Sequence, residues 1–185
     1  MSTVKILGVP GSLRKASYNR MALKAAQGLM PSDAELEIFD LQGIPLFSED
    51  DEHTPPERVV EFKKKIREAH AILFATPEYN YSFPGVLKNA IDWASRPYGD
   101  SAWAGKPAAI LGASIGPGGT ARAQYHLRQT FVFLNLQPVQ QPEVLIGVAS
   151  QKFDAAGNLT DEALKEQLRQ LLGNLVGLTR QIRKA

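Results

Sequence analysis

Three segments of this chain carry residue types that could do chemistry, and each follows an apolar run. The first, residues 8–20, reads GVPGSLRKASYNR. Ser12, Ser17 and the amide of Asn19 offer neutral hydrogen-bond donors, and Arg14 adds a planar, permanently charged fork suited to phosphate oxygens. A helix that begins behind the loop adds free N–H groups and partial positive charge. This composition suits a phosphate monoester.

Two common nucleotide motifs are missing from the first segment. The pattern G-x-x-x-x-G-K-[ST], with its reaching lysine, is absent, which argues against a triphosphate site. The pattern G-x-G-x-x-G is absent too, so a dinucleotide in a Rossmann groove is disfavoured. A helix cap followed by a polar turn remains the alternative interpretation.

The second segment, residues 77–85, is aromatic and reads PEYNYSFPG. Aromatic faces can flank a planar ring, and the backbone and Asn80 can bond to its polar edge. Pro77 and Pro84 stiffen the loop, which reduces the entropy lost when it orders around a ligand. A small local core is the alternative. The third segment, residues 114–120, reads SIGPGGT, and its glycines allow close approach of backbone to a ligand. Taken alone, it is equally consistent with a plain turn.

The elements around these segments predict a parallel sheet covered on both faces, since short apolar runs alternate with amphipathic helical patterns. We expect strands at Val4–Val9, Ala34–Phe39, Ala71–Thr76 and Pro107–Ala113, and a fifth at Gln137–Val139 or Val144–Val148. We expect helices at Asn19–Leu29, at Pro56–Ala69, after Pro84, at Thr120–Leu134, and from an N-cap at Thr160 onward. Ligands bind outside the carboxyl ends of parallel strands, where the three segments would meet.

Size and composition indicate a single domain over residues 1–185. A net charge of +2 without basic clusters gives no reason to expect nucleic acid or a membrane surface as partner, and Lys63–Lys65 is expected to be a solvated helix face. The absence of cysteine excludes thiolate catalysis, disulfides and iron–sulfur sites. We find no secretory leader, so a cytoplasmic location is expected.

At these residues the chain resembles the NAD(P)H-dependent FMN reductase family, in particular its bacterial quinone and chromate reductase branch. The family pattern G-S-x-R-x-x-S-x-N matches residues 11–19, and P-E-Y-N-x-S-x-P-G followed by L-K-N-A-I-D-W matches residues 77–93. The segments A-G-K-P at 104–107 and A-R-x-Q-Y-H-L-R at 121–128 also match. The resemblance covers nearly the whole chain.

The resemblance implies a flavodoxin-like, doubly wound α/β fold with a five-stranded parallel sheet, helices on both faces and one bound FMN. It assigns the phosphate to Ser12, Arg14, Ser17 and Asn19, the isoalloxazine to residues 78–81, and the ring edge to Ser114. The complete predicted cofactor-binding set is Ser12, Leu13, Arg14, Lys15, Ala16, Ser17, Tyr18, Asn19, Pro77, Glu78, Tyr79, Asn80, Tyr81, Ser114 and Gly116.

No catalytic acid, base or metal ligand is assigned, because a bound flavin would carry the hydride chemistry itself. His53, His70 and His126 are interpreted as structural or exposed. For Glu78 we expect a salt bridge or a role at a helix start rather than proton transfer.

The predicted function is an FMN-dependent NAD(P)H oxidoreductase that reduces quinones by ping-pong hydride transfer. Free flavin, azo compounds and metal oxyanions stay open as acceptors, and NADPH or NADH stays open as donor. One alternative is a flavodoxin-type electron carrier, against which the net charge and Arg14 count. The other is a non-catalytic flavin-binding sensor, which the aromatic loop disfavours.

We also expect a homodimer or homotetramer, because members of the resembled family are dimers or tetramers. The segment Arg96–Trp103 is expected on the same edge as the three loops, where its aromatic residues could contact a partner subunit. The alternative is that Trp103 packs against its own helix.

Overall fold

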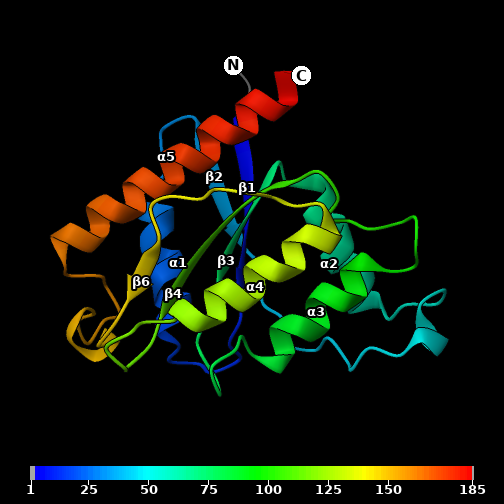
Figure 1. Ribbon diagram of the computed structural model, residues 1–185, viewed down its shortest axis with the longest axis horizontal. Coiled ribbons are helices and arrows are strands. Elements are labelled where there is room, and N and C mark those ends of the chain that lie inside the picture. The colour runs from blue at the N-terminus through cyan, green and yellow to red at the C-terminus, as the bar shows by residue number, and fades with distance from the viewer. Residues whose placement is uncertain (1–2, 185) are drawn as a thin grey trace.

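A parallel sheet with strand order β2-β1-β3-β4-β5 forms the centre of the molecule. The structure, a computed structural model, describes residues 3–184 (Figure 1). The strands are β1 (Val4–Pro10), β2 (Ala34–Ile38), β3 (Ala71–Ala75), β4 (Pro107–Ala113), β5 (Gln137–Pro138) and β6 (Val144–Ile146). Every residue of β3 and β4 is buried, because both strands are covered on both faces. This is the doubly wound, flavodoxin-like arrangement that the sequence predicts.

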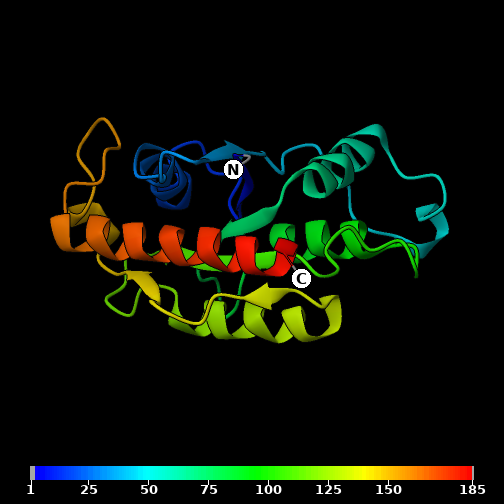
Figure 2. The same cartoon turned by 90° about the horizontal axis from the view of Figure 1, so that it is seen from above.

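Within the described residues, five α-helices cover the two faces of this sheet. Their bounds are α1 (Tyr18–Gly28), α2 (Glu57–Glu68), α3 (Gly85–Ser95), α4 (Ala121–Leu134) and α5 (Glu162–Lys184). Buried side chains of α1 and α5 share one apolar core, and those of α2, α3 and α4 share the core on the other face. Figure 2 shows α5 extending across much of the molecule. No helix within residues 3–184 is long and apolar enough to cross a membrane.

Both candidate segments for the fifth strand pair with β4. Residues 137 and 138 pair with its first half, and Val144–Ile146 pair with its last three residues. The chain leaves the ladder between them, in a stretch that contains Pro142, which has no backbone N–H to donate. The fifth position of the sheet is therefore divided between two short strands.

The last helix begins at a different cap from the one predicted. The Asp161 carboxylate accepts from the backbone N–H of Leu164 at 3.0 Å, whereas the Thr160 hydroxyl donates to the Lys152 carbonyl at 3.1 Å. Asp161 also pairs with Lys152 at 2.6 Å. The N-cap prediction at Thr160 was wrong by one residue, because an aspartate stands next to the threonine and takes the capping position.

Lys63 is buried, which contradicts the prediction of a solvated Lys63–Lys65 face. Its ammonium group donates to Asp100 Oδ2 at 2.8 Å and to the backbone carbonyl of Arg96. Arg67 approaches the same carboxylate at 2.6 Å. The hydrogen bond from Lys63 is the main reason that the pKa of Asp100 lies below its ordinary value. These contacts attach the segment after α3 to the side of α2.

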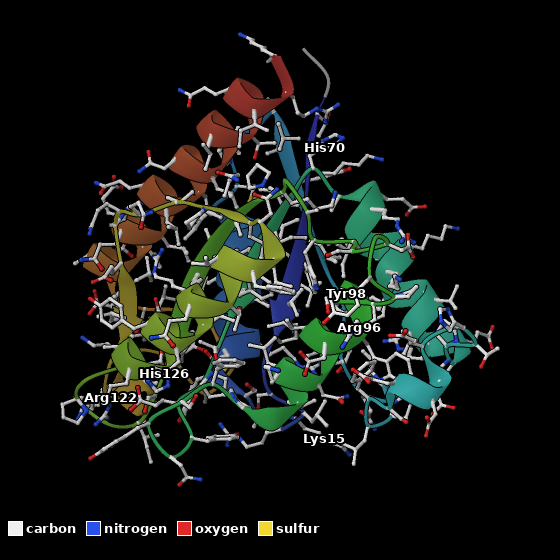
Figure 3. All side chains as sticks on the ribbon, turned by 45° about the vertical axis from the view of Figure 1, so that its right-hand side comes forward. Lys15, His70, Arg96, Tyr98, Arg122 and His126 are labelled. Atoms are coloured by element: carbon white, nitrogen blue, oxygen red, sulfur yellow. The ribbon has the colours of Figure 1, made fainter. Side chains whose placement is uncertain are left out.

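The segment Arg96–Trp103 does not lie on the edge predicted for it. It follows α3, which carries the chain away from the edge where β3 ends, and Asp100 contacts the C-terminal half of α2. In Figure 3, Arg96 and Tyr98 lie well apart from Lys15 and Arg122. The prediction neglected that a helix between two parallel strands returns the chain to the opposite edge.

Trp103 is fully buried and makes its contacts inside its own chain. Its Nε1–H donates to the carbonyl of Ile91 at 3.0 Å, and its ring meets those of Phe62 and Phe74 at centroid distances of 5.8 and 5.7 Å. The prediction of Trp103 as a partner contact was therefore wrong. Tyr98 remains exposed, with the Arg96 guanidinium 4.0 Å from its ring centroid.

Candidate functional site

A cavity of about 480 Å³ opens beyond the carboxyl ends of β1, β3 and β4. Its volume is within the range of small-molecule sites. It is lined by Ser12, Arg14, Ser17, Tyr18, Asn19, Pro77, Glu78, Tyr79, Ala113, Ser114 and Ile115. All three segments singled out in the sequence thus contribute to one wall or another of the same cavity.

Most residues of the predicted cofactor set line this cavity, and some lie outside its lining. Those outside are Leu13, Lys15, Ala16, Asn80, Tyr81 and Gly116. Two lining residues were not in the predicted set, Ala113 and Ile115. Ile115 lies in the glycine-rich loop 114–120, and Ala113 is the last residue of β4, directly before this loop. The position of the loop at the end of β4 could therefore have indicated both residues as part of the cavity lining.

The first loop turns at Gly11, where the backbone passes close to its neighbours. A Cβ at this position would come within 3.1 Å of Leu87 Cδ2 and 3.3 Å of Pro77 Cδ, so a larger residue would push the loop outward. The next residue, Ser12, is buried, and its hydroxyl oxygen accepts from the backbone N–H of Arg14 at 3.3 Å. This bond curls the loop around the cavity.

The N-terminus of α1 presents free backbone donors to the cavity. Ser17 is the N-cap and accepts from the Arg20 N–H at 3.5 Å, which is a long contact. Within residues 3–184, no oxygen accepts from the backbone N–H groups of Tyr18 and Asn19. Two amides of a helix's first turn, aimed with the positive end of its dipole, form a site for anionic oxygens.

Arg14 supplies a cation beside these amides. Its guanidinium lies 5.4 Å from the ring centroid of Tyr18, and that ring in turn packs against Phe153. In the described part of the chain no carboxylate lies within ion-pair distance of Arg14. The charge therefore stays available to a ligand in the cavity.

Asn19 uses its side chain to connect two walls of the cavity. Its Nδ2 donates to the carbonyl of Ala113 at 2.9 Å, and its Oδ1 accepts from the N–H of the same residue at 2.8 Å. One N–H of the amide is left for another acceptor. The sequence interpretation of Asn19 as a phosphate ligand can thus use only that N–H and the backbone amide.

The second loop forms a two-residue hairpin turn. Tyr79 N–H donates to the Ser82 carbonyl at 2.9 Å, and Ser82 N–H donates back at 3.0 Å. The central residues Asn80 and Tyr81 both have positive φ, 51° and 67°. Such a turn favours Asn at the first central position and Gly at the second, so a tyrosine at the second is unusual.

Glu78 attaches this second loop to the N-terminus of α4. Its Oε2 accepts from the backbone N–H groups of Arg122 and Ala123 at 3.1 and 3.3 Å, and its Oε1 pairs with the Arg122 guanidinium. Its side chain is 8% exposed. The expected salt bridge and role at a helix start are both present. The first amides of α4 are thereby satisfied within the protein.

None of the three histidines lines the cavity. His126 Nδ1 lies 3.1 Å from Ser82 Oγ, behind the hairpin, while His53 is exposed in its loop. His70 lies at the opposite end of the molecule from Lys15 and Arg122 (Figure 3), where its Nδ1 accepts from the Lys5 backbone N–H at 3.0 Å. Within residues 3–184, no cluster of acidic side chains and histidines could hold a metal ion.

Comparison with known proteins decides the family. The family described as NADPH-dependent FMN reductase matches residues 4–151. The chain belongs to this family. This FMN reductase family member is 54% identical over 181 residues to NAD(P)H-dependent FMN reductase PA1204 of Pseudomonas aeruginosa, covering 97% of each chain. It is 45% identical over 169 residues to the 2-hydroxy-1,4-benzoquinone reductase of a Burkholderia species, covering 91% of this chain and 92% of that one.

A solved structure agrees with this assignment over the whole fold. FerB of Paracoccus denitrificans, a flavoenzyme NAD(P)H:(acceptor) oxidoreductase, superimposes with a TM-score of 0.89 at 35% identity, covering 97% of this chain and 98% of FerB.

The cavity of this FMN reductase family member fits FMN by its donor set. Buried hydroxyls at Ser12 and Ser17, free amides at the start of α1 and the charge of Arg14 suit a phosphate monoester. Pro77, Tyr79 and Ser114, on the walls nearer to α4, offer apolar surface, an aromatic ring and a hydroxyl to a planar ring with a polar edge.

Proposed function

We propose that this protein is an FMN-dependent NAD(P)H oxidoreductase that reduces quinones. The single observation that carries the proposal is the polarity of the cavity. Hydroxyls, free amides and one cation meet at the α1 end, while an aromatic hairpin and a serine border the other end. The names of its relatives, among them a quinone reductase of Pseudomonas putida that is 48% identical over 155 residues, support quinones as acceptors.

Each residue has a separate task in this proposal. Ser12, Arg14 and Ser17 bind the phosphate together with the amides of α1, and Asn19 holds the two walls in register. Tyr79 flanks the ring, and Glu78 fixes the loop that carries Tyr79. FMN, when bound, supplies the ring that accepts and passes on hydride. The protein contributes orientation and partial exclusion of water.

The proposal includes a cytoplasmic location and a homodimer or homotetramer built from one domain per chain. The outer face of α4 supports association, because Val132 and Phe133 are 85% and 76% exposed there. Sedimentation of the FMN-loaded protein at micromolar and lower concentrations tests the assembly.

A direct assay separates the enzyme from the alternatives of another class. A yellow protein that oxidises NADPH with a quinone as sole acceptor is the proposed enzyme. One that does so only when a separate reductase is added is an electron carrier. A colourless protein that does not take up added FMN contradicts both readings.

A further inference from the structure

A second cavity, of about 410 Å³, lies between α1, the start of α5 and the loop 154–159 that precedes α5 (Figure 2). Among the described residues it shares no lining residue with the cavity at the carboxyl ends of the strands. Its volume is within the range of small-molecule sites. The proposed function does not use this second cavity.

One wall of the second cavity is a loop held in place by its own hydrogen bonds. The Asp154 backbone N–H donates to the Asn158 carbonyl at 3.0 Å, and the Asp154 carboxylate accepts from the backbone and side-chain N–H groups of Asn158 at 2.8 and 2.9 Å. Gly157 has φ 84°, and a Cβ there would meet Met21 Cγ at 3.2 Å, so the loop packs directly against α1. A wall fixed in this way loses little entropy when a ligand binds.

The second cavity also has an apolar surface, to which α1 and the loop both contribute. Its apolar side chains are Ala25, Leu29, Ala156 and Leu159. Gly28 and Gly157 add no side chain to the lining, so a ligand can approach the backbone closely there. Small side chains and bare backbone give a planar ring a surface on which to pack.

Two lysines give the second cavity a positive charge. Lys24 comes from α1 and Lys165 from α5, and no acidic side chain is among the described residues of the lining. Within residues 3–184 no carboxylate lies within ion-pair distance of Lys24. Lys165 pairs with Glu162 at 2.7 Å, but the Glu162 side chain is 76% exposed, so this pair contributes little.

The helix dipoles do not account for these two cations. A cation is favoured in the last turn of a helix, and the last turn of α1 contains no basic residue, so Lys24 lies before it. Lys165 lies at the end of the first turn of α5, where a cation is disfavoured. The two lysines therefore bring like charges to one cavity without a structural partner that explains both.

We propose that this second cavity is a binding site for a small aromatic carboxylate. The carboxylate pairs with Lys24 and Lys165 and so gives the two like charges a shared counter-ion. The ring packs on the apolar side chains of α1 and the loop. Inorganic phosphate would leave that apolar surface in water, and an uncharged ring would leave the lysines without a counter-ion. The proposal is independent of the proposed function, because the two cavities are separate.

Titration of the FMN-loaded protein with benzoate, followed through the NMR signals of backbone amides, tests the site. We expect the amides of Gly28, Gly157 and Asn158 to shift with a Kd in the millimolar range, and those of Ser12 and Ser114 to stay in place. Cyclohexanecarboxylate, which has the charge but no planar ring, binds more weakly than benzoate. Inorganic phosphate does not shift these signals.

Four variants sharpen the test. In Lys24→Gln and in Lys165→Gln, benzoate affinity falls by about 10-fold or more, because a hydrogen bond to a charged group is lost. Lys64→Gln, at an exposed lysine of α2 outside the cavity, leaves it unchanged. Gly28→Leu fills the cavity and abolishes binding. A Cβ at residue 28 meets no atom within 4 Å, and leucine favours a helix more than glycine does, so this variant keeps or raises the melting temperature.

Several outcomes would overturn the proposal. The absence of any shift at millimolar benzoate excludes the site, and shifts at Ser12 and Ser114 instead place benzoate in the first cavity. Equal binding of phosphate or of cyclohexanecarboxylate contradicts the proposed ligand class. Unchanged benzoate affinity in both lysine variants, or in a folded Gly28→Leu variant, shows that benzoate binds elsewhere.

Discussion

The Asn19 side chain hydrogen-bonds both the carbonyl and the N–H of Ala113, and so joins the start of α1 to the end of β4. Residues 19 and 113 are far apart in the sequence, yet this pair sets the distance between the loop that would bind phosphate and the loop that would meet the ring edge.

Replacing Asn19 by alanine is expected to lower the stability of the apoprotein by about 1–3 kcal/mol, because two buried backbone groups lose their partners. We also expect FMN affinity to fall, because the start of α1 and the end of β4 are no longer held at a fixed distance. Asn89→Ala is the matched control, because Asn89 also uses its amide on backbone, at Pro45 and Phe47, but does not line the cavity. Urea denaturation and FMN titration of both variants check this. An equal loss of FMN affinity in the two would contradict the positioning role.

Arg14→Ala is expected to weaken FMN binding by roughly 1.5–3 kcal/mol, the range for a hydrogen bond to a charged group. Arg169→Ala, on the exposed face of α5, leaves it unchanged. Fluorescence titration of apoprotein with FMN measures both. If Arg14→Ala binds FMN as tightly as the parent while Ser114→Ala loses it, the phosphate lies at the other end of the cavity.

Stability of the apoprotein is expected to fall as the pH drops below 6.5, the ordinary pKa of histidine. Burial, together with Arg183, Lys106 and Lys5, lowers the pKa of His70, and a nearby Glu35 opposes this only in part. The unfolded chain therefore binds the proton first, so stability present above pH 6.5 is lost as the pH falls through the folded-state pKa. Protonation of Nδ1 also removes the acceptor of the Lys5 N–H.

Denaturation midpoints at pH 7.5 and 5.5 measure this dependence. In His70→Gln the drop between the two values shrinks, whereas in His53→Gln, which alters an exposed histidine, it persists. A drop of the same size in His70→Gln would assign the effect to other groups.

Ping-pong kinetics are expected for NADPH and quinone, because we expect the nicotinamide to stack on the exposed flavin face, transfer hydride and leave before the acceptor occupies the same space. Double-reciprocal plots at several quinone concentrations should then be parallel. Lines that intersect to the left of the axis would mean that both substrates bind together, which would contradict a site that they share.

The sequence predicted the sheet well because its strands are short apolar runs bounded by turn residues. The prediction for β4 has the bounds of the structure, and β3 differs by one residue, Thr76. Once the strands were predicted, the three loops followed from them. The carboxyl ends of parallel strands lie at one edge of the sheet, so the loops after β1, β3 and β4 had to meet there.

What the sequence could not predict depends on partners distant along the chain. The burial of Lys63 requires Asp100, and the position of Trp103 requires the direction of α3. The conformation of Tyr81 lacked a sequence signal, because glycine normally marks such a turn. The exact lining of the cavity likewise follows from side-chain direction, which a motif does not contain.

Two of the helices that begin at this edge, α1 and α4, differ in the charge around their first turns. Glu78 accepts from the first amides of α4 and pairs with Arg122 there, whereas within residues 3–184 no carboxylate accepts from the amides of Tyr18 and Asn19 at the start of α1. We therefore expect a ligand with one anionic end and one neutral end to bind with its anionic end at the start of α1. In this arrangement the Glu78 carboxylate would disfavour the reversed orientation of the cofactor, because it would repel an anionic group placed near α4.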